Sequence, residues 1–247
     1  MGIYHKIKLD YRRGLGKIYT DEDIRKAKES PSFEREYNLK YYGLIGNTFP
    51  PSLVERCMEL GDENSGINTL AYHPCGVDFG FSDAKTVICV GEWDNEKKML
   101  RVVKMDDFGT NPPTPEQVAN RMFDLYQELG PNTHFFVDGS NAGTVNQIKI
   151  KFQENLNWRQ QKQDIINKSD RIHPINFGYQ KEHCKLLFNM YDLASKDMLA
   201  IPSKYEKLIT SMRTAMMVEY DLDKNETVNH DYLDACRLMC KGVAIRK

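Results

Sequence analysis

One carboxylate inside an apolar run is the feature that most constrains the fold of this chain. Asp78 lies in the stretch Gly76–Gly80, and a second apolar run, Thr86–Val90, follows after a short polar break. Burying an isolated carboxylate is costly unless it is hydrogen-bonded or binds a metal ion. Asp78 therefore either caps a backbone turn or belongs to a group of polar side chains that the fold brings together.

The order of apolar segments predicts an α/β fold around this run. Strands at 71–79, 86–93 and 99–106 are separated by turn-forming residues, which predicts a three-stranded antiparallel meander. A helix capped by Thr114 and ended by Gly130 leads to a short apolar strand at 134–138. Because a helix crosses between the meander and this strand, we expect the strand to run parallel to the first one.

The rest of the chain continues the alternation of helices and strands. A helix capped by Ser140 or Asn141 runs to about Leu156, and a polar, basic loop spans 157–171. The later expected elements are a strand at 172–177, a helix at 180–196, an edge strand at 199–202, a helix at 205–213, a strand and turn at 216–227 and a helix at 230–243. Together they predict a mixed sheet, an antiparallel meander extended by parallel strands and flanked by helices.

The first part of the chain has a different character. Residues 1–70 are expected to form an N-terminal arm and connector, with a helix starting at Thr20 and a short amphipathic helix from Pro51 to Leu60. Residues 71–247 are expected to form the main domain. No apolar run approaches the roughly 20 residues that span a bilayer, and six cysteines without a CxxC pair suggest reduced thiols. We therefore expect a soluble protein of the cytoplasm that binds no membrane.

Charge is balanced overall but uneven along the chain. The formal net charge is −1, which gives no general attraction to nucleic acid or membrane. Residues 139–185 contain eight Lys or Arg against four Asp or Glu, whereas residues 219–234 contain six acids and one lysine. This pattern fits a metal site beside a phosphate-binding surface, or simply an uneven solvated surface.

Four acids are placed where they could meet. Asp78 lies inside the first expected strand and Asp138 ends a later strand that we expect to be parallel to it, and binding sites form where such strands end. Asp231 and Asp234 share one face of the last helix at i,i+3, with His230 beside them. Local roles are the alternative: Asp138 as a helix cap, Asp231 as a dipole partner and Asp234 as a surface acid paired with Arg237 or Lys241.

Such a group of carboxylates indicates bound cations. Converging carboxylates repel one another unless hard divalent ions lie among them, and Mg²⁺ and Mn²⁺ prefer oxygen ligands. Two such ions polarise a phosphate, activate water and hold the leaving oxygen, which is the chemistry of phosphodiester hydrolysis. Gly76 and Gly80 would let metal and phosphate approach the strand closely.

Several short motifs carry a resemblance to a known family. They are Gly76-Val77-Asp78-Phe79-Gly80, Phe136-Val137-Asp138-Gly139 and His230-Asp231-Tyr232-Leu233-Asp234-Ala235, preceded by connector-like segments at 32–37 and 46–49. In this order they resemble the RNase H-like nuclease domain of viral DNA-packaging terminase large subunits. The chain departs from the family in having Tyr232 where a second acid often stands, and in having no Gly-rich phosphate loop.

The resemblance implies an activity and a set of roles. It implies an endonuclease that cleaves double-stranded DNA with two Mg²⁺ or Mn²⁺ ions during viral genome packaging, in the cytoplasm of the infected host cell. Asp78 would bridge both ions, and Asp138 and Asp231 would each hold one. On the last helix Asp231 is the first choice of metal ligand and Asp234 the second, with His230 as a substitute ligand. Implied partners are a packaging ATPase domain and a portal or small terminase subunit.

DNA affinity in such an enzyme would come from basic side chains on phosphates. The candidates are Lys85, Lys149, Lys151 and Lys181, with Arg159, Lys162 and Lys185. Three alternatives remain open: a junction resolvase or RNase H-type nuclease of the same fold, an assembly module that docks on a packaging motor or portal, and a sugar-kinase-like ATPase.

Overall fold

The computed structural model describes two compact units. The described residues are 16–18, 20–27, 47–62, 66–80, 85–109, 111–159, 171–176, 180–218 and 221–244. The first unit, residues 1–45, contains the helix α1 (Asp21–Ala27), which begins as predicted after Thr20. The hydroxyl of Thr20 accepts the N–H of Asp23 at 3.1 Å. Most of the predicted arm and the connector segment at 32–37 lie outside the described residues.

The second unit, residues 46–247, is built on a six-stranded mixed sheet. The predicted meander is confirmed: β1 pairs antiparallel with β2, and β2 with β3. The strand β4 pairs with β1 in parallel, also as predicted, so that β1 is central in the order β5-β4-β1-β2-β3-β6. The strands are β1 (His73–Asp78), β2 (Val87–Asp94), β3 (Met99–Asp107), β4 (Thr133–Asp138), β5 (Ile172–Ile175) and β6 (Leu199–Ala200).

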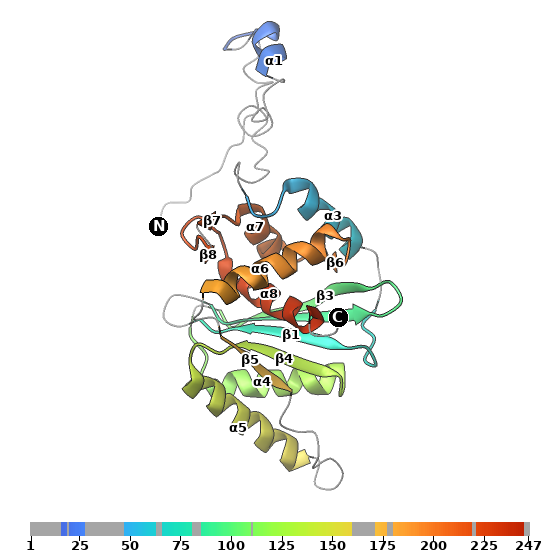
Figure 1. Cartoon of the computed structure of the whole chain (residues 1–247), viewed down its shortest axis with the longest axis vertical. Helices are drawn as coiled ribbons and strands as arrows, with labels where there is room; N and C mark the ends of the chain where they lie inside the picture. The colour runs from blue at the N-terminus through green and yellow to red at the C-terminus, as the bar shows by residue number, and fades with distance from the viewer. Residues whose placement is uncertain are drawn as a thin grey trace. The chain divides into compact units, whose positions relative to one another are not determined.

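Helices cover both faces of this sheet (Figure 1). The helices α4 and α5 lie on one face, and α3, α6, α7 and α8 lie on the other. Their bounds are α3 (Pro51–Asp62), α4 (Pro115–Leu129), α5 (Ala142–Arg159), α6 (Gln180–Ser195), α7 (Glu206–Thr214) and α8 (His230–Ala244). A hairpin of two short strands, β7 (Met217–Val218) and β8 (Asp221–Leu222), precedes α8.

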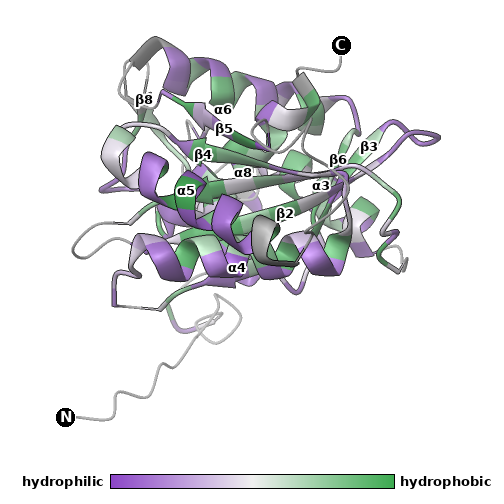
Figure 2. Cartoon of the chain, turned by 90° about the horizontal axis from the view of Figure 1, so that it is seen from below, coloured by the Kyte–Doolittle hydropathy of each residue, from purple (hydrophilic) through white to green (hydrophobic). Residues whose placement is uncertain are grey.

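The alternation of side chains along β1 divides the interior into two cores. Cys75 and Val77 are fully buried against α4 and α5, so Gly76 and Asp78 face the opposite side, where α8 packs. Figure 2 shows α4 and α5 with mixed hydrophilic and hydrophobic residues over largely hydrophobic strands. Asp78 is therefore a polar residue at the end of a strand that is buried on both faces.

Two boundaries differ from the expectations. The chain divides between Ile45 and Gly46, whereas the sequence predicted a boundary near residue 70. The helix α3 packs into the second unit, because its buried Val54 and Cys57 join the core beneath α6, α7 and α8. The helix α5 also continues to Arg159, into the segment expected to be loop.

Gly76 has a role that the sequence did not reveal. Backbone atoms of α8, at Ala235 and Met239, lie where a Cβ on residue 76 would be. The missing side chain thus allows α8 to approach β1, rather than a metal ion or phosphate as expected. This contact fixes the first turn of α8 beside the end of β1.

Candidate metal centre

Parallel pairing brings Asp78 and Asp138 to the same edge of the sheet. Val77 pairs with Val137, so the next residues, Asp78 and Asp138, end their strands side by side. Phe136, two residues before Asp138, packs against α6 and α8, and the alternation along β4 directs Asp138 to that same face. Both aspartates are 8% exposed.

The first turn of α8 brings two further acids to this edge. Asn229 adopts a left-handed conformation with φ of 55°, which asparagine tolerates, and α8 begins at the next residue. Asp231 is 8% exposed and Asp234 is fully buried. The spacing i,i+3 puts both on the face of α8 that meets β1.

The electrostatics of Asp78 reflect how close these acids are to one another. Burial raises the pKa of the Asp78 carboxyl well above its ordinary value, and the negative charges of Asp234, Asp138 and Asp231 raise it further. Lys224 acts in the opposite direction. A carboxylate held in this way is stabilised by any cation that enters the group.

Asp138 also has a local role, but it is not the helix cap that was considered. Its Oδ1 accepts the N–H of Ser140 at 2.9 Å, and its Oδ2 accepts the Ser140 hydroxyl at 2.8 Å. Asn141 caps α5 instead, by accepting the N–H of Thr144. Each Asp138 oxygen keeps a further lone pair, so the turn leaves the carboxylate able to bind a cation.

Asp231 is held by two neighbours. Its Oδ2 accepts the backbone N–H of Lys85 at 3.3 Å, and its Oδ1 lies 3.3 Å from His230 Nε2. The Lys85 contact ties the segment between β1 and β2 to the first turn of α8. His230 lies beside Asp231 on the more exposed side of the group, and its role as a substitute ligand stays a prediction.

Asp234 occupies the deepest position. Its Oδ1 lies 2.6 Å from Nη2 of the fully buried Arg237, which in turn lies 3.0 Å from His183 Nδ1. Its Oδ2 lies 3.6 Å from Lys224 Nζ. Among the described residues, neither Asp234 oxygen has a hydrogen-bond partner of good geometry. The pairing with Arg237 was foreseen, but as a surface pair rather than a buried one.

The donor set suits a hard divalent cation. Aspartate oxygens are the ligands that Mg²⁺ and Mn²⁺ prefer, and the Asp234 oxygens have unused hydrogen-bonding capacity. No three His, Cys, Asp or Glu side chains in the described part of the chain form a ready-made cage. Mg²⁺ does not require one, because it is usually held by one or two carboxylates and keeps several waters.

A second network adjoins this group. Lys207 Nζ donates to Asp107 Oδ2 and to the Tyr232 hydroxyl, each at 2.7 Å, and the Tyr232 hydroxyl also donates to Asp107. The hydrogen bond from Lys207, and to a smaller extent the one from Tyr232, lowers the pKa of Asp107 to about 2. Tyr232 thus anchors the first turn of α8 to the end of β3 and to α7, and its neighbour Asp231 is fixed accordingly. Sequence spacing gave no signal for this network.

The predicted DNA-binding lysines are separated by the structure. Lys85 adjoins the acids, but Lys149 and Lys151 lie on α5, on the other face of the sheet from α8. Lys151 is paired with Glu116 at 3.0 Å and with Glu154 at 3.6 Å. The side chains of Lys181 and Arg159 and the whole of Lys162 are outside the description, and Lys185 pairs with Glu182 at 3.2 Å.

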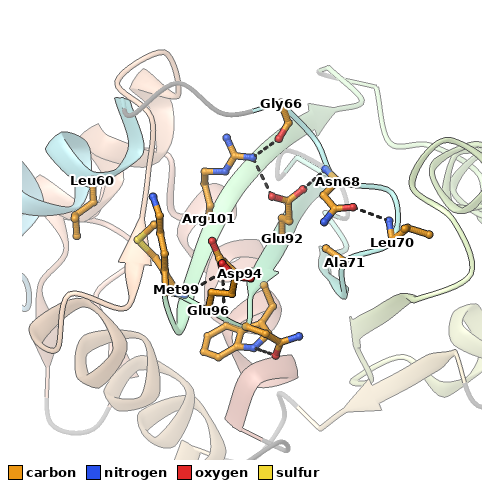
Figure 3. Close-up of a pocket in the computed structure, with 13 residues that line it drawn as sticks. Leu60, Gly66, Asn68, Leu70, Ala71, Glu92, Asp94, Glu96, Met99 and Arg101 are labelled. Carbon is orange, nitrogen blue, oxygen red and sulfur yellow. Dashed lines mark hydrogen bonds and ion pairs between the residues drawn. The ribbon is translucent and has the colours of Figure 1, made fainter.

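A cavity of about 510 Å³ lies elsewhere, near the start of β1 and the β2–β3 hairpin (Figure 3). Its polar floor is a hydrogen-bonded set in which Arg101 donates to Glu92 at 3.0 Å and to the Gly66 carbonyl at 2.8 Å. The backbone N–H of Asn68 donates to Glu92 at 2.6 Å. These groups satisfy one another, and the length of β1 separates them from Asp78 by about 17 Å.

Solved structures share this fold. The large terminase nuclease of the thermophilic phage G20c superimposes with a TM-score of 0.58 and 13% identity, over 80% of this chain and 98% of that one. A structure of the same nuclease with bound magnesium gives a TM-score of 0.55 and 14% identity, over 80% and 98% of the two chains. The sequence matches no protein-family model and no curated protein.

A match to a longer large terminase chain shows the same fold. The large terminase of bacteriophage HK97 has a TM-score of 0.56 and 13% identity, and the match covers 93% of this chain but 52% of that one. This chain therefore corresponds to about half the length of that terminase. The RNase H-like fold predicted from the sequence is confirmed. In the described part of the chain, no helix is both long enough and apolar enough to span a membrane.

Proposed function

We propose that this protein is a metal-dependent endonuclease that cleaves double-stranded DNA, and that it acts in viral genome packaging. The observation that carries the proposal is the meeting of Asp78, Asp138, Asp231 and Asp234 at one sheet edge, where their charges raise the pKa of Asp78. The shared fold with terminase nuclease domains, one of them solved with magnesium, supports it.

In this proposal the acids are the ligands of two Mg²⁺ or Mn²⁺ ions. Asp78, Asp138 and Asp231 would hold the ions, with Asp78 at the centre of the group. Asp234 supports the site from beneath, paired with Arg237. The bound ions would polarise the phosphate and activate water. Water adds to phosphorus and the leaving sugar oxygen takes up a proton, which gives a phosphomonoester and a free hydroxyl.

Nicking of supercoiled plasmid with Mg²⁺ or Mn²⁺ tests the proposal. Asp78→Asn and Asp138→Asn should each lower the rate by at least roughly a hundredfold, because each removes a metal ligand. Asp124→Asn is the matched control, since Asp124 is an exposed acid on α4, and it should leave the rate unchanged. Ser140→Ala removes the hydroxyl bond to Asp138 Oδ2 and keeps both the backbone bond to Oδ1 and the charge of Asp138, so it separates a structural role of Asp138 from a catalytic one.

The substrate and the class of function are tested in parallel. Linear duplex, a four-way junction and an RNA–DNA hybrid, assayed side by side, distinguish a packaging nuclease from a resolvase or an RNase H-type enzyme. A docking module for an ATPase domain or portal would show no Mn²⁺ binding that depends on Asp78. If Asp78→Asn cuts DNA as fast as the parent protein does, the assignment of the site is refuted.

A further inference from the structure

Lys224 is the one lysine in the acidic stretch 219–234, and its ammonium lies beside Asp234 of the carboxylate group. Its Nζ is 3.6 Å from Asp234 Oδ2. The Lys224 side chain is 52% exposed, whereas that of Asp234 is 1% exposed. The lysine thus approaches from solvent and reaches an acid that is buried.

The backbone beneath Lys224 is well fixed. The carboxylate of Asp223 accepts the N–H of Asn225 at 2.9 Å, and the Asp223 carbonyl accepts the N–H of Thr227 at 2.9 Å. The N–H of Asp223 donates to the Met216 carbonyl at 2.7 Å. These bonds hold the turn between β8 and α8, so only the flexible four-carbon stem of Lys224 has to move for its ammonium to change position.

The contact between Lys224 and Asp234 is loose, and Asp234 does not depend on it. A separation of 3.6 Å is too long for a hydrogen bond. Arg237 already pairs with the other oxygen of Asp234 at 2.6 Å. The charge of Lys224 nevertheless lowers the pKa of Asp78, so its field extends to the centre of the group. Lys224 is therefore an exchangeable cation among carboxylates that attract cations.

We propose that a divalent cation entering the group displaces the Lys224 ammonium from Asp234, and that the displaced lysine then binds a phosphate of the DNA backbone. Two cations at one carboxylate repel each other, and the half-exposed lysine is the one that can leave. A half-exposed lysine ammonium beside the carboxylates would attract a backbone phosphate presented to the site. This inference rests on the proposed nuclease function.

Lys224→Ala tests the exchange through two affinities that should change in opposite directions. Mn²⁺ binding to the DNA-free protein, measured by isothermal titration calorimetry, should become roughly five-fold tighter because a competing charge is removed. Affinity for a short duplex, measured by fluorescence anisotropy with Ca²⁺ present, should fall several-fold. The slope of log affinity against log salt should decrease in magnitude by about 1, the loss of one phosphate contact.

Two further variants serve as controls. Lys224→Arg keeps the charge, and its Mn²⁺ affinity should stay near that of the parent. Lys104→Ala removes a lysine that is ion-paired with Glu128 of α4 at 2.7 Å, and it should change neither affinity. An unchanged or weaker Mn²⁺ affinity in Lys224→Ala, or an unchanged DNA affinity, overturns the exchange.

The outcomes also separate this inference from the proposed function. If the parent protein binds Mn²⁺ through Asp78 and cuts DNA, but Lys224→Ala does not show the two opposite changes, only the exchange is wrong. If the parent neither binds Mn²⁺ through Asp78 nor cuts DNA, both proposals fail together.

Discussion

Gly76 of β1 faces Ala235 of α8 so closely that a Cβ atom on residue 76 would lie 1.9 Å from the Ala235 carbonyl oxygen. The same Cβ would lie 2.4 Å from the backbone nitrogen of Met239. Because both obstacles are helix backbone, they cannot move without moving α8. The distance between the strand acids and the helix acids therefore depends on a glycine two residues before Asp78.

Gly76→Ala should consequently destabilise the protein and impair the site. We expect the free energy of unfolding to fall by about 3 kcal/mol or more, as for severe overpacking. Chemical denaturation measures the loss, and Mn²⁺ titration shows whether the acids still bind together. Gly66→Ala is the matched control, because no atom lies within 4 Å of the added Cβ. Equal stability of the two variants would contradict the close packing.

Asp78→Asn should stabilise the metal-free protein, increasingly so at higher pH. The folded state raises the Asp78 pKa, so between the ordinary and the folded pKa the folded protein binds more protons than the unfolded chain. Stability of the parent then falls as pH rises through that window, by about 1.4 kcal/mol for each pH unit that the window spans. Asparagine does not titrate, so the variant lacks this fall.

Thermal unfolding between pH 4 and pH 8, with and without Mn²⁺, measures this effect. The parent should gain stability from Mn²⁺ at neutral pH, whereas Asp78→Asn should gain little. A parent whose stability does not depend on Asp78 at any pH would contradict the crowding of negative charge around this residue.

Asp107→Asn should lose stability at neutral pH and lose nothing in strong acid. Lys207 and Tyr232 lower the Asp107 pKa to about 2, so its contribution is complete above the ordinary aspartate pKa and disappears as pH falls through about 2. With allowance for solvent screening, we expect a loss of about 1 kcal/mol at pH 7. Urea unfolding at pH 7 and pH 2.5 checks it, because the loss should already be clearly smaller at pH 2.5 than at pH 7. The double variant Asp107→Asn with Tyr232→Phe should lose less free energy of unfolding than the sum of the losses of the two single variants.

Arg237→Met should be strongly destabilising, because it leaves the Asp234 carboxylate buried without its close partner. We expect a loss of about 3–5 kcal/mol in the free energy of unfolding, which a second change, Asp234→Leu, should largely restore. Lys241→Met is the matched control: Lys241 pairs with Glu182 at 3.2 Å near the surface, so the loss should stay below about 1 kcal/mol. Similar losses for Arg237→Met and Lys241→Met would argue against a buried pair.

The elements of the fold were predictable where the signals are local. Thr114 and Gln117 form a reciprocal capping box at the start of α4, and Gly130 ends that helix. The acids Asp78 and Asp138 end apolar runs, so their meeting follows from parallel pairing alone. Helix caps and strand ends depend on residues that are adjacent in the sequence, so the sequence alone predicts them.

What the sequence could not predict depends on contacts between distant segments. The carbonyl of Cys57 accepts the N–H of Ile201 at 2.8 Å, which joins α3 to the end of β6. No local sequence pattern predicts a hydrogen bond between residues so far apart in the chain. The network of Asp107, Lys207 and Tyr232 draws on three separate elements. Charge counted along the chain also does not reveal which face a lysine occupies, which is why Lys149 was grouped with a site on the opposite face.

The division of the acids between early strands and the last described helix has a consequence for protein synthesis. Asp78 and Asp138 leave the ribosome well before Asp231 and Asp234, and the packed position of α8 depends on the missing side chain of Gly76 in β1. A nascent chain that has not yet extended past residue 229 carries only two of the four carboxylates. Chains interrupted before α8 thus lack half of the proposed metal site, and truncation before residue 230 should abolish any Mn²⁺ binding that needs all four acids.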